Sequence, residues 1–502
     1  MSDEFRELDR RGLPVAAVFM SGVAALAAVP TAIGLSSISV GVALAWSLPG
    51  ALFVVVAGVV AEWLRLRFTR YRVGADRVEL RTGVLIRTRR SLQRDRIRTV
   101  DVTADPLLRV FGLVSVRIGT GEHADDGTVR LRPVTRATGD ELRRALLARV
   151  GRGEAEDTLA VLDPGWIRYA PLSFVAPTLG IAAFGGALNA ADWVGRAGGV
   201  IDWAVDLLVG LGLVGAIAVL AGVVLLVGVV GAAGLWVEMW WGYRLDREPG
   251  GTLRVRRGLL TTRSISIEED RLRGVDVVEP LGARLAGAAR VDAVAAGMAT
   301  KVEKDKARHR TLLPAAPGAV AHRVAADVLR EPVSPTDAVR LSPHPVAARG
   351  RRLRWALAAV LAGELPLIVL GLVLTEVLLH IAWITSVLAV PVAVALALDA
   401  YRSLGHGSVG GYLVTRSGSV RRSTVALQRR GIVGWTVRQS VFQRRAGLST
   451  VAATTAAGSG AYAIRDVGTS TGLEAADAAV PGLLAPFLER TPAADSSGRR
   501  RA

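Results

Sequence analysis

The octapeptide DRIRTVDV occupies residues 95–102, and the related octapeptide DRLRGVDV occupies residues 270–277. The two copies differ only at their third and fifth positions, and a long stretch of other sequence separates them. Charged residues alternate with apolar ones in both copies, which is typical of a half-buried β-strand. A basic phrase repeated over so long a distance predicts that a β-rich domain has been duplicated within the chain.

The flanking sequence extends the repeat and adds a third copy. Each copy opens with a tyrosine followed by alternating residues, and each has a glycine before a later predicted strand. The tyrosines are Tyr71, Tyr243 and Tyr412, and the glycines are Gly112, Gly287 and Gly447. Each copy ends in a predicted helix, at residues 138–150, at 319–331 and, with a weaker pattern, within 472–490. The repeated unit is therefore a small β-domain closed by a helix.

The copies also differ in ways that bear on function. The second has an insertion near Gly250 and Gly251 and a weak strand signal in GAARVDAVAAG, residues 287–297. The third has Arg430 and Gly431 where the second has Asp270 and Arg271. A function that needed the Asp-Arg pair in every copy would be missing from the third.

Six long apolar segments precede the β-domains in three pairs. They cover about residues 15–35 and 38–61, 169–191 and 207–236, and 355–379 and 381–399. Each approaches or exceeds the ~20 residues that a helix needs to cross the hydrocarbon core of a bilayer. The alternative, buried core helices of a large soluble protein, is disfavoured because all six segments are poor in charge and occur in pairs.

The arginine distribution predicts how these helices are oriented. Arginines flank the outer ends of the pairs, as in the stretch from Arg65 to Arg72, whereas the turns inside the pairs are uncharged or acidic. Cytoplasmic flanks of membrane helices are enriched in Lys and Arg. We therefore expect three helical hairpins in the bacterial plasma membrane, with both termini and all three β-domains in the cytoplasm. This arrangement accounts for much of the formal net charge of +18.

Three stretches of the repeat resemble a known family. The stretch from Arg94 to Gly121, its copy from Asp270 to Gly297, and the third copy from Gly434 to Gly458 are similar to the bacterial membrane-flanked PH-like domain family, of the YdbT-like kind with three such domains. The resemblance covers nearly the whole chain. It implies a small, strongly bent antiparallel β-structure closed by a C-terminal helix. It also implies a role in envelope defence or stress tolerance.

The combined prediction is a membrane protein of the α+β class, with six transmembrane helices in three hairpins, each followed by a cytoplasmic PH-like β-domain with a C-terminal helix. Its parts are hairpin 1 (1–68), PH-like domain 1 (69–152), hairpin 2 (166–242), PH-like domain 2 (243–331), a linker (332–352), hairpin 3 (353–402), PH-like domain 3 (403–491) and a disordered basic tail (492–502).

No residue pattern indicates catalysis or a bound metal or cofactor. The chain has no cysteine, and its six histidines are scattered without metal-ligand spacing. Nucleic acid is disfavoured because the basic residues lack interleaved aromatics. We therefore expect a protein that is not an enzyme, with no cofactor and no metal. The expected partners are membrane lipids, with a second PH-like membrane protein or a homo-oligomer as further candidates.

The candidate site residues are basic clusters in the repeats. A domain tethered to the inner leaflet lies close to anionic headgroups, so the candidates for facing lipid or an anionic ligand are Arg94, Arg96, Arg98, Arg271, Arg273, Arg429 and Arg430. A strand at 94–98 would place Arg94, Arg96 and Arg98 on one face. The alternative is a solvated basic face without a ligand.

One carboxylate, Glu364, interrupts the fifth apolar segment. A carboxylate at membrane depth is costly and often functional, so it could belong to an ion or proton site. A residue hydrogen-bonded to a neighbouring helix is the favoured interpretation, because no partner carboxylate is evident. The main functional hypothesis is thus an integral membrane protein whose PH-like domains bind lipid, peptide or protein. The alternative is a transport or export component for membrane-active peptides or other solutes.

Overall fold

The computed structural model describes residues 5–36, 39–74, 76–83, 87–94, 97, 99–119, 128–147, 157–172, 175–193, 206, 209–249, 251–296 and 310–487. The chain divides into two compact units. The first unit comprises Met1–Leu272 and Gly282–Val328, and the second comprises Arg273–Leu281 and Leu329–Ala502. The predicted tail at 492–502 lies outside the described residues.

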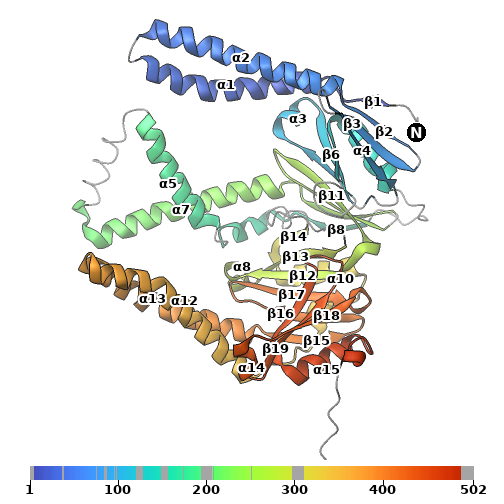
Figure 1. Ribbon diagram of the computed structural model, residues 1–502, viewed down its shortest axis with the longest axis vertical. Coiled ribbons are helices and arrows are strands. Elements are labelled where there is room, and N and C mark those ends of the chain that lie inside the picture. Colours follow the sequence, from blue (N-terminus) through green and yellow to red (C-terminus); the bar gives the residue numbers. More distant parts are fainter. Residues whose placement is uncertain are drawn as a thin grey trace, which may run out of the picture. The chain divides into compact units, whose positions relative to one another are not determined.

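The first β-domain contains two antiparallel ladders and a closing helix (Figure 1). One ladder has the strand order β1 (Arg6–Glu7), β2 (Arg70–Val73), β3 (Arg77–Thr82), β4 (Thr88–Gln93). The other contains β5 (Thr99–Ala104), β6 (Leu113–Gly119) and β7 (Thr128–Thr135), with α3 (Pro106–Val110) after β5 and α4 (Arg136–Leu147) after β7. Alternate residues of both ladders share one core with Leu142 of α4. The first copy is therefore a small β-domain closed by a helix, as the repeat predicts.

The second β-domain repeats this plan and adds a strand. β8 (Asp157–Val161) and η2 (Pro164–Leu172) come first, followed by β9 (Arg244–Glu248), β10 (Thr252–Arg257), β11 (Thr262–Glu268), η3 (Glu269–Arg271) and β12 (Leu272–Pro280). α8 (Leu281–Leu285), β13 (Ala288–Ala295), β14 (Thr311–Pro317) and α10 (Gly318–Leu329) complete it. The weak strand signal at 287–297 corresponds to β13, a strand of eight residues whose small side chains are mostly buried.

The third β-domain lies in the second unit and follows a short helix, α11 (Pro335–Ala338). Its first ladder contains β15 (Gly405–Val409), β16 (Tyr412–Ser417) and β17 (Arg421–Gln428), and η4 (Arg429–Gly431) leads to the next. The second ladder contains β18 (Gly434–Arg438), β19 (Leu448–Thr454) and β20 (Ala461–Gly468), with α14 (Val441–Arg445) after β18. α15 (Thr469–Ala479) and η5 (Ala485–Phe487) follow.

The strand registers repeat along the chain. Arg77 lies opposite Gln93 in the first domain, Thr252 opposite Glu268 in the second, and Tyr412 opposite Gln428 in the third. In this strand pair, both residues are displaced along the sequence by the same amount from one domain to the next. Because a slip of one residue would turn every side chain to the other face, the shared register confirms that the three domains are copies of one unit.

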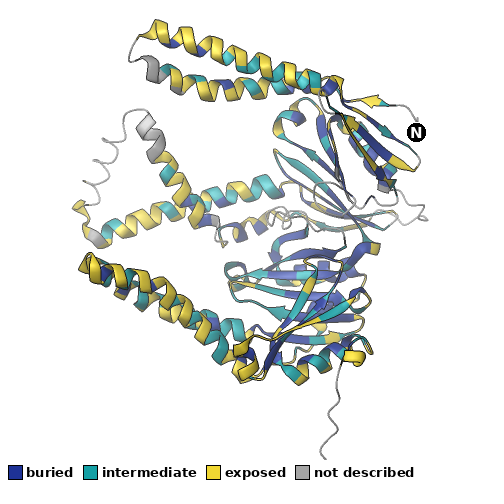
Figure 2. Cartoon of the chain, in the orientation of Figure 1, coloured by how far each residue is buried: buried dark blue, intermediate teal, exposed yellow. Residues whose placement is uncertain are grey.

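Long apolar helices precede the domains. They are α1 (Gly12–Ser36), α2 (Val40–Arg67), α5 (Val175–Trp193), α7 (Gly212–Trp240), α12 (Val346–Val373) and α13 (Glu376–Arg402). Within the described part of the chain, five stretches are long and apolar enough to cross a membrane, and at most 17% of the residues in each are buried (Figure 2). A sixth would be Pro164–Leu172 together with Ala176–Ala187, which bend by 74°. α1 packs with α2, α5 with α7, and α12 with α13.

Strand pairing continues from one domain to the next. In the first unit, β5 pairs with β11, and Val102 lies opposite Ser264. In the second unit, β12 pairs with β17, and Asp276 lies opposite Val425. The second pairing is reinforced by ion pairing between Arg422 and Glu279 and by a hydrogen bond from Ser423 to Asp276. Neither junction is predicted by the sequence pattern.

Candidate functional site

A pocket of about 940 Å³ lies where the first and second domains join within the first unit. β5, α3, β6 and α4 contribute lining residues from the first domain, and β9, β10 and β11 contribute them from the second. Trp241 and Gly242, directly after α7, also line it. If α7 spans the membrane, the pocket is therefore adjacent to the point where the chain leaves the bilayer.

The pocket is strongly basic. Its lining includes two carboxylates, Asp140 and Glu248, and eight arginines, namely Arg109, Arg136, Arg143, Arg144, Arg254, Arg256, Arg257 and Arg263. Guanidinium groups recognise phosphate and carboxylate through paired hydrogen bonds, so this composition suits an anionic ligand.

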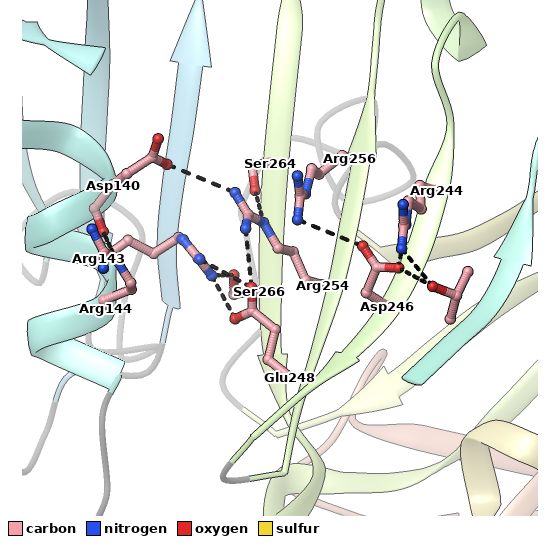
Figure 3. Close-up of polar contacts among 11 residues, drawn as sticks. Asp140, Arg143, Arg144, Arg244, Asp246, Glu248, Arg254, Arg256, Ser264 and Ser266 are labelled. Carbon is pink, nitrogen blue, oxygen red and sulfur yellow. Dashed lines mark hydrogen bonds and ion pairs between the residues drawn. The ribbon is translucent and has the colours of Figure 1, made fainter. Parts of the chain in front are cut away.

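Part of the cluster is already neutralised. Arg143 is buried and donates two hydrogen bonds to Glu248, with Nη1 at 2.7 Å from Oε2 and Nη2 at 3.0 Å from Oε1 (Figure 3). Arg254 donates to Oε1 of the same carboxylate at 3.0 Å and to the hydroxyl of Ser264 at 2.9 Å. Burial tends to raise the pKa of Glu248, but the two arginines outweigh it and lower the pKa. Glu248 is therefore an ionised anchor that holds the arginines in place.

Positive charge remains in excess around this anchor. Burial, followed by the charges of Arg143 and Arg256, lowers the pKa of Arg254, which shows that cations are crowded there. The side chains of Arg136 and Arg263 make no hydrogen bond or ion pair with any residue that the structure describes. These two guanidinium groups are the ones most available to a bound anion.

The rim of the pocket combines basic and apolar groups. The guanidinium of Arg257 lies 4.2 Å from the ring centroid of Trp240, a cation–π contact that fixes the residue at the end of α7. Trp241 and Leu260 are more than half exposed. The loop that carries Leu260 is held by Glu238, whose carboxylate accepts hydrogen bonds from the backbone N–H groups of Leu260 and Thr261 at 2.9 Å. Tryptophan at such a position is typical of a membrane interface.

A second basic pocket of about 950 Å³ occupies the corresponding place in the first domain. Its lining includes Arg81, Thr82, Gly83, Arg87, Thr88 and Arg89. The offset that relates the two octapeptides converts these, in order, into residues of the first pocket: Arg256, Arg257, Gly258, Thr262, Arg263 and Ser264. Trp63, Arg67 and Phe68, at the end of α2, also line it. In both the first and the second domain, a basic pocket therefore lies at the end of an apolar helix.

The comparisons with known proteins agree with this geometry. A family model described as bacterial PH domain matches residues 16–150, 204–331 and 357–479, which together make up well over half of the chain. The chain belongs to the bacterial PH domain family. No curated protein and no solved structure gave a match. The family resemblance inferred from the sequence is confirmed, and the three β-domains are PH domains that occur in one chain with apolar helices.

The structure places two of the predicted basic residues in equivalent PH-domain turns. The strand expected at 94–98 is contradicted at its two described residues, Arg94 and Ile97, which follow the end of β4 at Gln93 and belong to no strand. Arg94 donates to the backbone carbonyl of Ala145 near the end of α4. Arg429, in the equivalent turn of the third domain, donates to Ala478, at 2.7 Å, and to Ala479 near the end of α15. Arg96 and Arg98 lie outside the described residues.

The other predicted arginines lie in different surroundings. Arg271 is buried in η3 and pairs with Glu268, because a guanidinium there needs a carboxylate to offset desolvation. Arg273 is on β12 and packs its methylene groups against Gly431. Arg430 is exposed and donates to Gln428 at 3.1 Å. None of these residues lines either of the two basic pockets, and their role as ligand contacts stays a prediction.

Glu364 lies on α12 and is buried against α13. The hydroxyl of Thr385 donates to Glu364 Oε2 at 3.1 Å. This contact is the hydrogen-bonded arrangement that the sequence analysis favoured. No group of three or more metal-binding side chains occurs among the described residues.

Sequence reasoning missed the arginines of the pocket for a physical reason. They come from α4, β10 and β11, and they converge only because β5 pairs with β11. One signal was available: the stretch RVRRG, residues 254–258, follows closely after Trp240 and Trp241. Alternating arginines near an aromatic pair at a helix end could have been taken as an interfacial anion site.

Proposed function

We propose that this chain is an integral plasma-membrane protein that holds three PH domains at the cytoplasmic surface and binds anionic lipid headgroups there. Three hairpins of apolar helices supply the anchors, and the arginine bias of their flanks supports a cytoplasmic position for the domains. The protein acts by binding and carries no catalytic constellation among the described residues. Lipids are its first partners, and a role in envelope defence or stress tolerance follows from the family resemblance alone.

The observation that carries this proposal is the basic pocket beside the end of α7. Six more arginines than carboxylates line it, and Arg136 and Arg263 have no partner among the described residues. The phosphate of a phosphatidylglycerol or cardiolipin headgroup would reach this depth from the inner leaflet, since Trp241 and Leu260 lie at the acyl boundary if α7 spans the membrane. Each arginine near an anionic surface contributes ~1 kcal/mol.

The test is lipid retention by the purified full-length protein. The chain would be extracted from nanodiscs of phosphatidylcholine with one tenth cardiolipin, and co-purifying lipids would be counted by native mass spectrometry. We expect the double variant Arg136→Gln/Arg263→Gln to retain roughly thirtyfold less cardiolipin than the natural protein, because two contacts of ~1 kcal/mol are lost and each 1.4 kcal/mol is about tenfold in affinity. The built ion cluster of Arg143, Glu248 and Arg254 stays intact in this variant.

The matched control is Arg323→Gln/Arg340→Gln, which removes two exposed arginines that line neither basic pocket. It should retain cardiolipin like the natural protein. Equal losses in both double variants would show that only net charge matters, and unchanged retention in the pocket variant would refute the site.

A further inference from the structure

The two junctions between PH domains share one register. In the first, Val102 lies opposite Ser264 and Thr103 opposite Arg263. The second pairs Val277 with Thr424 and Val278 with Ser423. Val102 and Val277 are equivalent positions of the repeat, and so are Ser264 and Thr424. The two junctions therefore pair equivalent residues. Both junctions are therefore formed in the same way. The first strand of the second ladder in one domain (β5 or β12) pairs with the last strand of the first ladder in the next domain (β11 or β17).

Each of the two strand types that form a junction has one further copy, and that copy pairs with no other PH domain in the described part of the chain. β4 is the counterpart of β11 and β17, and it is the terminal strand of its sheet. β18 is the counterpart of β5 and β12, and it is terminal in the sheet β18-β19-β20. Most residues of β4 and β18 are exposed, whereas β12 and β17 are mostly buried or half-buried. A terminal strand presents backbone groups that can pair with another chain.

Glycine positions show the contrast most clearly. A Cβ atom added to Gly274 would lie 1.9 Å from the carbonyl oxygen of Ala426 on β17, so the neighbouring strand leaves no room for a side chain. Gly434 is the counterpart of Gly274 in the third domain, and a Cβ atom there would meet nothing within 4 Å among the described residues. A neighbouring strand could therefore approach Gly434 as closely as β17 approaches Gly274.

We propose that β18 of one copy of this chain pairs with β4 of a second copy, in the register of the internal junctions. That register sets Gly434 opposite Leu92, Trp435 opposite Ser91, Thr436 opposite Arg90, Val437 opposite Arg89 and Arg438 opposite Thr88. The contact is head-to-tail, so successive copies form a ring or an open row of PH domains along the membrane.

The side chains of the two strands fit this register. Gly274 opposite Leu427 in the second junction becomes Gly434 opposite Leu92, with the same residue types. Arg263 opposite Thr103 in the first junction becomes Thr88 opposite Arg438, again one arginine against one threonine. No pair in the proposed register sets two arginines directly opposite each other, so the strongest like-charge repulsion is avoided. Val437, which is 44% exposed, would be covered.

Cysteine cross-linking tests the register in the full chain, which contains no natural cysteine. Two differently tagged chains, one with Thr88→Cys and one with Arg438→Cys, would be co-expressed, and their membranes would be oxidised mildly. Directly opposite residues in an antiparallel pair have Cα atoms ~4.5–5.5 Å apart, within the ~4.4–6.8 Å of a disulfide. We expect a disulfide-linked heterodimer that carries both tags.

The matched control pairs Thr88→Cys with Val437→Cys, whose side chain points to the other face of the strand. It should give at least about tenfold less cross-linked heterodimer, because its geometry does not suit a disulfide. Equal yields from both pairs would indicate random collision and overturn the proposal. An absent Thr88–Arg438 cross-link would also overturn it, provided that a small maleimide labels both cysteines and so shows them to be accessible.

Discussion

At the scale of single residues, the buried histidine pair His344 and His406 joins the linker to the third PH domain. His344 Nε2 lies 3.1 Å from His406 Nδ1, and His344 Nδ1 lies 3.2 Å from the carbonyl oxygen of Asp466. Arg351 and Arg352 both pair with the buried Asp466 carboxylate, so cations are close. Burial lowers the pKa of both histidines, and the neighbouring His344 contributes to lowering that of His406 to about 4.

This pair predicts a loss of local stability in mild acid. The unfolded histidine titrates near pH 6.5 and the folded His406 near pH 4, so the unfolded state binds more protons between these values. The free energy of local unfolding should therefore fall by about 1–2 kcal/mol as the pH drops from 7 to 5. Hydrogen exchange of residues 342–346 and 403–409, corrected for the intrinsic rate, should be roughly tenfold faster at pH 5.

The variant His406→Gln should show a much flatter dependence on pH, whereas His380→Gln, on α13, should behave like the natural protein. If His406→Gln keeps the full dependence on pH, another group is responsible. Sequence reasoning could not find this pair, because the two histidines are far apart in the sequence and each looks isolated.

At the scale of elements, an arginine in each PH domain donates a hydrogen bond to a backbone carbonyl in the last turn of that domain's final helix. Arg94 serves α4 and Arg429 serves α15 from the same turn, while in the second domain Arg247 donates to Asp327 on α10 at 2.7 Å and pairs with Glu269. The last carbonyl groups of a helix have no partner within the helix, so an arginine there satisfies them. The alternation around the repeated octapeptide correctly predicted a strand in its second half. It could not predict that Arg94, directly before the octapeptide, donates to the end of α4.

Replacing Arg429 should therefore affect stability. Arg429→Met removes two hydrogen bonds to α15, and we expect the free energy of local unfolding of this helix to fall by about 1–2 kcal/mol. Hydrogen exchange of residues 469–479 would measure the change, and cardiolipin retention should not change. Arg430→Met, in the adjacent exposed residue, is the control. Unchanged exchange combined with lost cardiolipin would instead support Arg429 as a lipid contact.

At the scale of the whole molecule, the sequence predicted three copies of a β-domain and paired apolar segments, because alternation and hydropathy are local patterns. The junctions β5–β11 and β12–β17 escaped prediction, since strands that pair across domains have the same alternation as strands that pair within one. The basic pocket depends on the first junction and escaped with it. Because the pocket lies where two PH domains join, the repeat forms the candidate site, and no single motif does.

The central claim is that all three PH domains meet the inner surface of the membrane. Since the chain has no cysteine, single substitutions report position directly: Ala137→Cys, Ala286→Cys and Ser459→Cys each place one exposed thiol in a different domain. The measurement is labelling by a membrane-impermeant maleimide in intact cells and in inverted membrane vesicles. Our account predicts labelling of all three variants in inverted vesicles and of none in intact cells, and labelling of any one of them in intact cells would contradict it.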